Sequence, residues 1–190
     1  MRNIRIAIVS LLVPLALLLS ACAVTDVTAT APEELTFIHL NDTYRVGAVE
    51  DGNKGGFGRV VTMLRILEMV GADVRVLHGG DFLYPSLESQ LWHGQQMVEA
   101  FNYMDDIAPM FVVAGNHEFD RRTPESLVNA VRASRFDWIG DNYRFNTGAS
   151  DVDNALHSGF TYVHNGKKVG VFSLTLHPDD GGTDRDYVPI

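Results

Sequence analysis

Residues 110–120 read Met-Phe-Val-Val-Ala-Gly-Asn-His-Glu-Phe-Asp and are the most informative stretch of the chain. The apolar residues at its start are typical of a strand buried in a parallel sheet, and Gly115 then lets the backbone turn. The run Val74 to Leu77 has the same character and is followed by Gly79-Gly80-Asp81. Because ligands of open α/β sheets bind at the carboxyl ends of the strands, both segments predict polar side chains at one edge of an α/β fold.

A third segment, Phe37 to Tyr44, ends an earlier apolar run in the same way. The three segments place ligand-type groups in their turns: Asp42, Asp81, Asn116 and His117. Carboxylate, amide and imidazole groups suit divalent metals, so the set is interpreted as a metal site. The alternative is that these residues only form turns and cap helices, as Asn and Asp often do. That alternative does not explain why all three turns carry ligand-type side chains.

The order of these motifs resembles the calcineurin-like metallophosphoesterases, and within them the bacterial 5′-nucleotidase branch. That branch carries Asp-x-His, then Gly-Asp, then Gly-Asn-His-Glu. The resemblance implies that Asp42 is a metal ligand, that Asp81 bridges two metals and that Asn116 is a ligand of the second. It also implies that His117 lies beside the scissile phosphate. Tyr44 occupies the position of a family histidine, and it is either a ligand or a hydroxyl outside the coordination shell.

The resemblance also implies an activity and a layered fold. The activity is metal-dependent phosphoester hydrolysis on nucleotides or related phosphate esters, with two divalent metal ions such as Mn, Zn or Mg. Residues 35–190 would be the N-terminal part of an α/β/β/α metallophosphoesterase sandwich. His117 would be the catalytic imidazole and Asp120 would orient its ring. Asp120 could instead be a helix-capping or solvated charge ahead of the helix expected from Pro124.

The remaining ligands of the family pattern are missing from the sequence. The family carries a Thr-His and a Gly-His-x-His motif beyond the fourth strand, and a C-terminal domain whose aromatic residues stack the base. After residue 165, His177 is the only histidine, and it has no partner at ligand spacing. Two metals would be underliganded, so the chain is interpreted as a fragment of a hydrolase that is inactive alone. The alternative is a catalytically dead nucleotide- or metal-binding envelope lipoprotein.

The N-terminus resembles the export signal of a bacterial lipoprotein. A basic start is followed by an apolar stretch from Ile6 to Leu19, shorter than the ~20 residues of a membrane-spanning helix. The sequence Leu19-Ser20-Ala21-Cys22 then resembles a lipobox. We therefore expect a signal peptide over 1–22, a lipid on Cys22 that binds the membrane, and a tether over 23–34. Ala23 after the cysteine favours the periplasmic face of the outer membrane. An ordinary signal peptide with an incidental thiol is the alternative.

Composition argues against one class of partner. With 46% hydrophobic and 21% charged residues, the sequence is typical of a globular domain. The formal net charge of −9 disfavours nucleic acid, because the phosphate backbone would be repelled. A small phosphate ester remains compatible with an acidic chain, since bound metal cations invert the local field.

Hydrophobic periodicity predicts alternating strands and helices followed by a hairpin. Asn165-Gly166 is a strong hairpin signal. Leu83, Leu87 and Leu91 are expected to form one packing face. The predicted strands are 35–40, 74–77, 110–114 and 136–139, the predicted helices are 57–70, 95–104 and 124–134, and the predicted hairpin strands are 160–164 and 168–174.

Five other polar positions are given supporting or surface roles. His39 and His78 are expected to pack or to support the site rather than to bind metal. His157 and His164 are expected at the surface or in the hairpin. For Asp141, a helper role at the site and a plain turn are both open.

Overall fold

The computed structural model describes residues 34–121, 123–176 and 187–189, all of which belong to one compact unit. The expected signal peptide, the lipidated Cys22, most of the tether and His177 lie outside the described residues. Within the described ranges, no helix is both long and apolar enough to cross a membrane.

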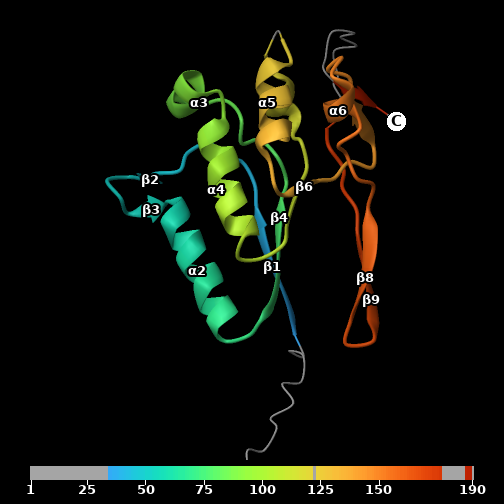
Figure 1. Ribbon diagram of the computed structural model, residues 1–190. Coiled ribbons are helices and arrows are strands. Elements are labelled where there is room, and N and C mark those ends of the chain that lie inside the picture. Colours follow the sequence, from blue (N-terminus) through green and yellow to red (C-terminus); the bar gives the residue numbers. More distant parts are fainter. Residues whose placement is uncertain (1–33, 122, 177–186, 190) are drawn as a thin grey trace, which may run out of the picture. The chain divides into compact units, whose positions relative to one another are not determined.

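A four-stranded parallel sheet forms the centre of the fold (Figure 1), which confirms the predicted α/β class. Its strands are β1 (Leu35–Leu40), β4 (Asp73–His78), β5 (Met110–Val112) and β6 (Asp137–Trp138), hydrogen-bonded in the order β1-β4-β5-β6. At the carboxyl ends, Leu40 lies opposite His78, and His78 lies opposite Val112. The loops after these three strands therefore begin side by side.

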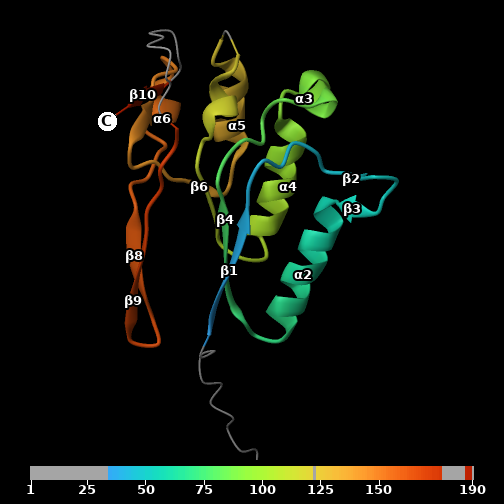
Figure 2. The same ribbon diagram turned by 180° about the vertical axis from the view of Figure 1, so that it is seen from behind.

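Three helices lie on one side of the sheet (Figure 2): α2 (Phe57–Met69), α4 (Gln95–Asp105) and α5 (Glu125–Ala133). The core between them and the sheet contains Val76 and Val112, both fully buried. Phe82 and Phe101 fill its centre, with ring centroids 4.7 Å apart. Burial of these apolar side chains is the main source of stability for the sheet, and so for its carboxyl-terminal edge, where the candidate site lies.

The opposite face of the sheet contacts a two-stranded hairpin, β8 (Phe160–His164) and β9 (Lys167–Val171). Successive strand residues point to opposite faces, so Phe111 of β5 faces this hairpin, and its ring centroid lies 4.5 Å from that of Phe160. The turn is the predicted Asn165-Gly166, with φ of 47° and 77°. His164 lies in the hairpin, which is one of the two predicted places: it ends β8, its side chain is 10% exposed and its Nδ1 lies 2.7 Å from Asp73 Oδ2.

Several short elements were not predicted. These are β2 (Ala48–Val49), β3 (Lys54–Gly55), α3 (Leu87–Trp92), the 3₁₀ helix η1 (Asn116–Phe119), β7 (Tyr143–Phe145), α6 (Ser150–Asp153) and β10 (Tyr187–Pro189), which pairs with β7. The predicted leucine packing face is wrong. Leu83 is fully buried, whereas Leu87 and Leu91 are 77% and 62% exposed, because α3 begins only at Leu87 and the three residues share no helix face.

Asp141 joins two later segments of the chain. Its Oδ1 accepts the backbone N–H of Gly159 at 2.7 Å, and its Oδ2 accepts that of Ser173 at 2.8 Å. These bonds hold the chain on both sides of the hairpin, so Asp141 does more than form a turn. They give it a structural function.

Candidate functional site

The loops after β1 and β4 are held together by backbone hydrogen bonds. The N–H of Gly79 donates to Leu40 O at 2.9 Å, and the N–H of Asp42 donates to Gly80 O at 3.2 Å. Asp42 and Asp81 both have left-handed backbone conformations, with φ of 52° and 61°. Such φ values are uncommon outside glycine, and Asp and Asn are among the residues that tolerate them. The two predicted metal ligands are therefore placed by tight turns at adjacent strand ends.

The loops after β4 and β5 approach each other just as closely. A Cβ added to Gly80 would collide with the backbone of Gly115, and one added to Gly115 would collide with the Asp81 carboxylate. Only glycine fits at these two positions. This contact explains why the Gly-Asp and Gly-Asn-His-Glu motifs of the sequence occur together at one site.

Glu118 joins these two loops through its side chain. The carboxylate is 3% exposed and accepts four backbone N–H groups. Its Oε2 accepts from Asp81 at 2.8 Å and Gly115 at 2.6 Å, while its Oε1 accepts from Phe82 at 2.8 Å and Leu83 at 3.0 Å. Sequence reasoning assigned no role to this residue. The detectable signal was an acidic residue three positions after Gly115, at the spacing of a capping box.

The protonation of Glu118 reflects two opposing effects. Burial raises the pKa of its carboxyl to about 7, and the backbone hydrogen bonds from Leu83, Phe82 and Asp81 act in the opposite direction. In all four of these hydrogen bonds the carboxylate is the acceptor. The geometry therefore suits the ionised form, which has acceptor capacity for all four donors.

The Asp81 carboxylate faces the start of η1. Its Oδ1 accepts the backbone N–H of His117 at 2.9 Å. Burial raises the pKa of Asp81, and the hydrogen bond from His117 opposes that rise. Asn116, which precedes His117, is the first residue of η1 and is half-buried. The structure thus brings three of the predicted residues to one place.

The His117 ring contacts the carboxylate of Asp120, as the resemblance implied. The bond joins Nδ1 to Asp120 Oδ2 over one turn of chain. It raises the pKa of His117, while partial burial lowers it. The two side chains are 35% and 39% exposed, so the pair is open to solvent and to a ligand. A hydrogen bond at Nδ1 leaves Nε2 as the ring atom that can reach a substrate.

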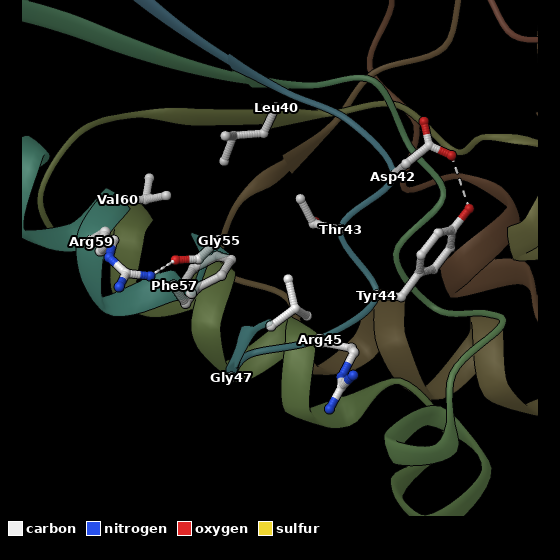
Figure 3. Close-up of a pocket in the computed structure, with 12 residues that line it drawn as sticks. Leu40, Asp42, Thr43, Tyr44, Arg45, Gly47, Gly55, Phe57, Arg59 and Val60 are labelled. Carbon is white, nitrogen blue, oxygen red and sulfur yellow. Dashed lines mark hydrogen bonds between the residues drawn. The ribbon is translucent and has the colours of Figure 1, made fainter. Parts of the chain in front are cut away.

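Tyr44 acts as a donor to Asp42 in this structure. Its hydroxyl donates to Asp42 Oδ1 at 2.9 Å (Figure 3), and the amide of Asn41 donates to Asp42 Oδ2. Burial raises the pKa of the Tyr44 phenol, and the bond to Asp42 raises it further. The ring also lies edge-on to His117, with centroids 6.1 Å apart. A protonated phenol is a poor metal ligand, so this arrangement matches a hydroxyl outside the coordination shell.

His78, at the end of β4, hydrogen-bonds the two loops of the site as a neutral ring. Its Nδ1 accepts the N–H of Gly80 at 3.0 Å, which leaves the proton on Nε2, and that atom lies 2.7 Å from Thr43 Oγ1. Burial lowers the pKa of His78 to about 3. One imidazole therefore holds the loops after β1 and β4 in place, in the supporting position that the sequence suggested. His39 is exposed.

The described donors only partly fit the expected metals. Asp42, Asp81 and Asn116 offer oxygen ligands, which suit hard divalent ions. Yet among residues 34–121, 123–176 and 187–189, no group of three or more His, Cys, Asp or Glu side chains is placed to hold a metal ion. The roles of Asp42, Asp81, Asn116, His117 and Asp120 stay predictions.

Comparison with known proteins gives a family and a related fold. Residues 35–189 match the sequence profile of the calcineurin-like phosphoesterases. The solved structure of Haemophilus influenzae NAD nucleotidase (NadN) is similar to this chain at 21% identity with a TM-score of 0.63, over 80% of this chain and 29% of that one. At this identity the similarity shows a shared fold. The chain spans less than a third of the length of NadN. No curated protein matches the chain.

Proposed function

The chain belongs to the calcineurin-like phosphoesterase family. From this premise we propose that it is a metal-dependent phosphoester hydrolase of the 5′-nucleotidase type, acting on nucleotides or related phosphate esters. The observation that carries the proposal is the arrangement around Glu118, which holds Asp81 against η1 and beside the paired side chains of His117 and Asp120. The similarity to a nucleotidase structure supports the choice of substrate class.

The chemistry assigned to His117 follows from its surroundings. The hydrogen bond that the ring donates to Asp120 raises the pKa of His117, so a larger share of the ring is cationic near neutral pH. A cationic imidazole stabilises negative charge on phosphoryl oxygens or protonates the leaving oxygen. Phosphate monoester hydrolysis is among the slowest uncatalysed reactions, so such stabilisation is needed. The bond between Nδ1 and Asp120 restrains the ring and leaves Nε2 as the atom that would act on a substrate.

A second candidate function is a catalytically dead protein that binds metal or nucleotide. Two observations favour it: Tyr44 is a protonated donor where the family has histidine, and the described residues contain no group of three ligand side chains. Under this alternative, Asp81 would still hold a metal but no turnover would follow.

The test adds free imidazole, which can take the place of the histidine side chains expected from the family pattern. Hydrolysis of p-nitrophenyl phosphate and AMP by the full chain is measured with Mn²⁺, with and without added imidazole, and Mn²⁺ binding is followed by calorimetry. The variants are Asp81→Asn, in which asparagine tolerates the left-handed φ of 61°, and the matched control Asp151→Asn in α6, whose exposed side chain pairs with Arg132. For a hydrolase we expect turnover that appears with imidazole and is lost only in Asp81→Asn.

The other results decide between the two functions. Turnover without imidazole would support the hydrolase and show that the chain is not inactive alone. Mn²⁺ binding that is lost in Asp81→Asn, with no turnover under any condition, would establish the binding protein. No Mn²⁺ binding and no turnover would overturn both.

We also propose that the protein is an exported lipoprotein anchored through Cys22. The support is the sequence Leu19-Ser20-Ala21-Cys22 after an apolar stretch. Mass spectrometry of the mature N-terminus tests it: cleavage before Cys22 with acyl groups on that residue is expected. An intact leader, or a mature chain with an unmodified cysteine, would contradict the proposal.

A further inference from the structure

The outer face of helix α2 carries apolar side chains that the fold does not bury. We define the α2 patch as Met63, Ile66, Met69 and Val70, all of which are exposed, Met69 by 84% and Val70 by 73%. Residues three and four positions apart are neighbours on a helix, so these side chains lie on one face. The opposite face of α2 packs on the core through Leu64, which is 1% exposed. A contiguous exposed apolar patch of this kind marks a binding surface.

The α2 patch lies at the end of the sheet where the described chain begins. α2 ends at Met69, and the chain then enters β4 at Asp73, which pairs with Leu35 at the start of β1. Glu34, the first described residue, directly precedes Leu35. Figure 1 shows the start of β1 and the C-terminal end of α2 at the same end of the domain. The chain that leads back to Cys22 is therefore attached beside the α2 patch.

The length of that chain limits how far this end of the domain can move from a membrane that holds Cys22. Cys22 and Glu34 are 12 positions apart in the sequence. A flexible chain of this length spans about 20 Å on average and at most about 40 Å when fully extended. A surface at the attachment point thus stays close to the lipid, and in a tethered molecule it needs little affinity of its own to bind there.

The hairpin turn adds positive charge at the same end of the domain. His164, before the turn, contacts Asp73 at 2.7 Å, so the turn lies near the start of β4. Lys167 and Lys168, directly after the turn, are both exposed. Lysines at a membrane surface attract anionic headgroups. They offset, at this end, the repulsion expected for a chain with a formal net charge of −9.

We propose that the α2 patch docks on the membrane to which Cys22 anchors the protein. The membrane as partner rests on the proposed lipid anchor, whereas the patch is a feature of the folded domain. The six residues of β4 separate the two ends of the sheet by about 17 Å. When the amino ends of the strands face the lipid, Asp42 and Asp81 at the carboxyl ends face the solvent. The candidate site is then open to dissolved phosphate esters and turned away from the phosphates of its own membrane.

The test measures the depth of an indole placed in the α2 patch. The full-length acylated chain with Met69→Trp and Trp92→Phe is reconstituted in vesicles of phosphatidylethanolamine and phosphatidylglycerol, with or without bromine on the acyl chains, which quenches nearby tryptophan. We expect the new indole to lose at least about half of its emission, because docked apolar faces enter the interface by about 5–10 Å.

The unmodified chain reports the orientation of the docked domain. Trp92 is 54% exposed on α3, which lies at the other end of the domain in Figure 1, and its emission should be retained in brominated vesicles. Trp138 is 3% exposed and is common to both chains, so it supplies the same background. Quenching of Trp92 to the same degree as the indole at position 69 would overturn the proposed orientation.

Two pairs of substitutions in the Met69→Trp chain test the apolar contact. Ile66→Gln with Val70→Gln should abolish the quenching, because glutamine is a good helix former but removes apolar surface. Leu87→Gln with Leu91→Gln, which changes exposed leucines of α3, should leave the quenching unchanged. Quenching that survives the first pair would overturn the proposal. So would an unquenched indole that is shielded from acrylamide without vesicles, which would show that the patch binds a second copy of the chain.

Mass spectrometry of the same sample separates this inference from the anchor. If Cys22 is acylated and the indole is not quenched, docking is overturned while the anchor stands. If Cys22 is not acylated, the anchor has failed, and quenching of the Met69→Trp chain with excess vesicles then tests the α2 patch alone. Quenching that only Ile66→Gln with Val70→Gln removes would support the patch. Quenching that is absent, or that neither pair changes, would overturn it.

Discussion

The Glu118 carboxylate accepts the backbone N–H of Asp81 at 2.8 Å, although the two residues are 37 positions apart in the sequence. The same oxygen also accepts the N–H of Gly115 at 2.6 Å. A buried acceptor of this kind fixes the position of the Asp81 backbone, and through it the direction of the Asp81 side chain. The candidate metal ligand after β4 therefore depends on a residue of the loop after β5.

Glu118→Gln should destabilise the protein strongly. A glutamine has one acceptor oxygen, so two of the four N–H groups would face an amide NH₂ instead of an acceptor. With about 1–3 kcal/mol for each of the two unpaired buried donors, we expect the free energy of unfolding to fall by about 2–6 kcal/mol in urea titrations. The control is Glu99→Gln on the exposed side of α4, which should change stability by less than about 0.5 kcal/mol. Equal stability of the two variants would refute the assigned function of Glu118.

His78 should make stability depend on pH. Burial lowers its folded-state pKa to about 3, whereas the unfolded ring titrates near 6.5. A lowered pKa means that this contribution is present above pH 6.5 and is lost as pH falls towards 3, at about 1.4 kcal/mol per pH unit. The expected loss between pH 7 and pH 5 is about 2 kcal/mol. In His78→Asn, urea unfolding should show lower stability at pH 7 and a weaker pH dependence. His93→Asn at an exposed position should keep the original slope.

Asp120→Asn should lower the pKa of His117. The hydrogen bond that His117 donates to Asp120 is the largest cause of the raised pKa, and partial burial, which acts in the opposite direction, would remain. NMR titration of the metal-free chain measures the shift, with Asp151→Asn as the control. Stability should respond little: the side chains are 35% and 39% exposed, so the pair contributes at most about 1 kcal/mol. That contribution is present below pH 6.5 and is lost as pH rises through the folded-state pKa. An unchanged pKa would contradict the pairing.

Substitutions at Tyr44 test whether it binds metal. Its phenol donates to Asp42 and its pKa is raised, so Tyr44→Phe should leave Mn²⁺ affinity within about threefold of the unmodified chain. Tyr44→His adds an imidazole at the position where the family has histidine and should tighten Mn²⁺ binding by about tenfold or add a second binding event. Calorimetry measures both. Loss of binding in Tyr44→Phe would show that the hydroxyl is a ligand.

The local parts of the fold could be predicted from the sequence. β1 has the predicted bounds, and α2 and β4 differ from the predicted ranges only at their ends, because apolar periodicity and flanking glycines mark them. The contact of His117 with Asp120 matches what the family resemblance implied. In each of these cases the signal that supported the prediction lies within a short stretch of the sequence.

Contacts between distant segments could not be predicted in this way. The partners of Glu118 are backbone groups of residues 81–83, which carry no side-chain signal. The hairpin position of His164 was predicted, but its contact with Asp73 was not, because the two residues are 91 positions apart in the chain. Leu87 and Leu91 were expected inside because spacing alone does not show where α3 begins.

The hydrogen bonds of Glu118 also set a condition on protein engineering. A designer who transplants the segment from Gly115 to Asp120 onto another α/β scaffold would import a buried anion with only one of its four donors, the N–H of Gly115. The recipient would need a turn equivalent to Asp81-Phe82-Leu83, at the same distance from the carboxylate. It would also need glycines equivalent to Gly80 and Gly115, where the two loops touch. The graftable module is therefore a pair of loops, discontinuous in sequence, and not the linear motif.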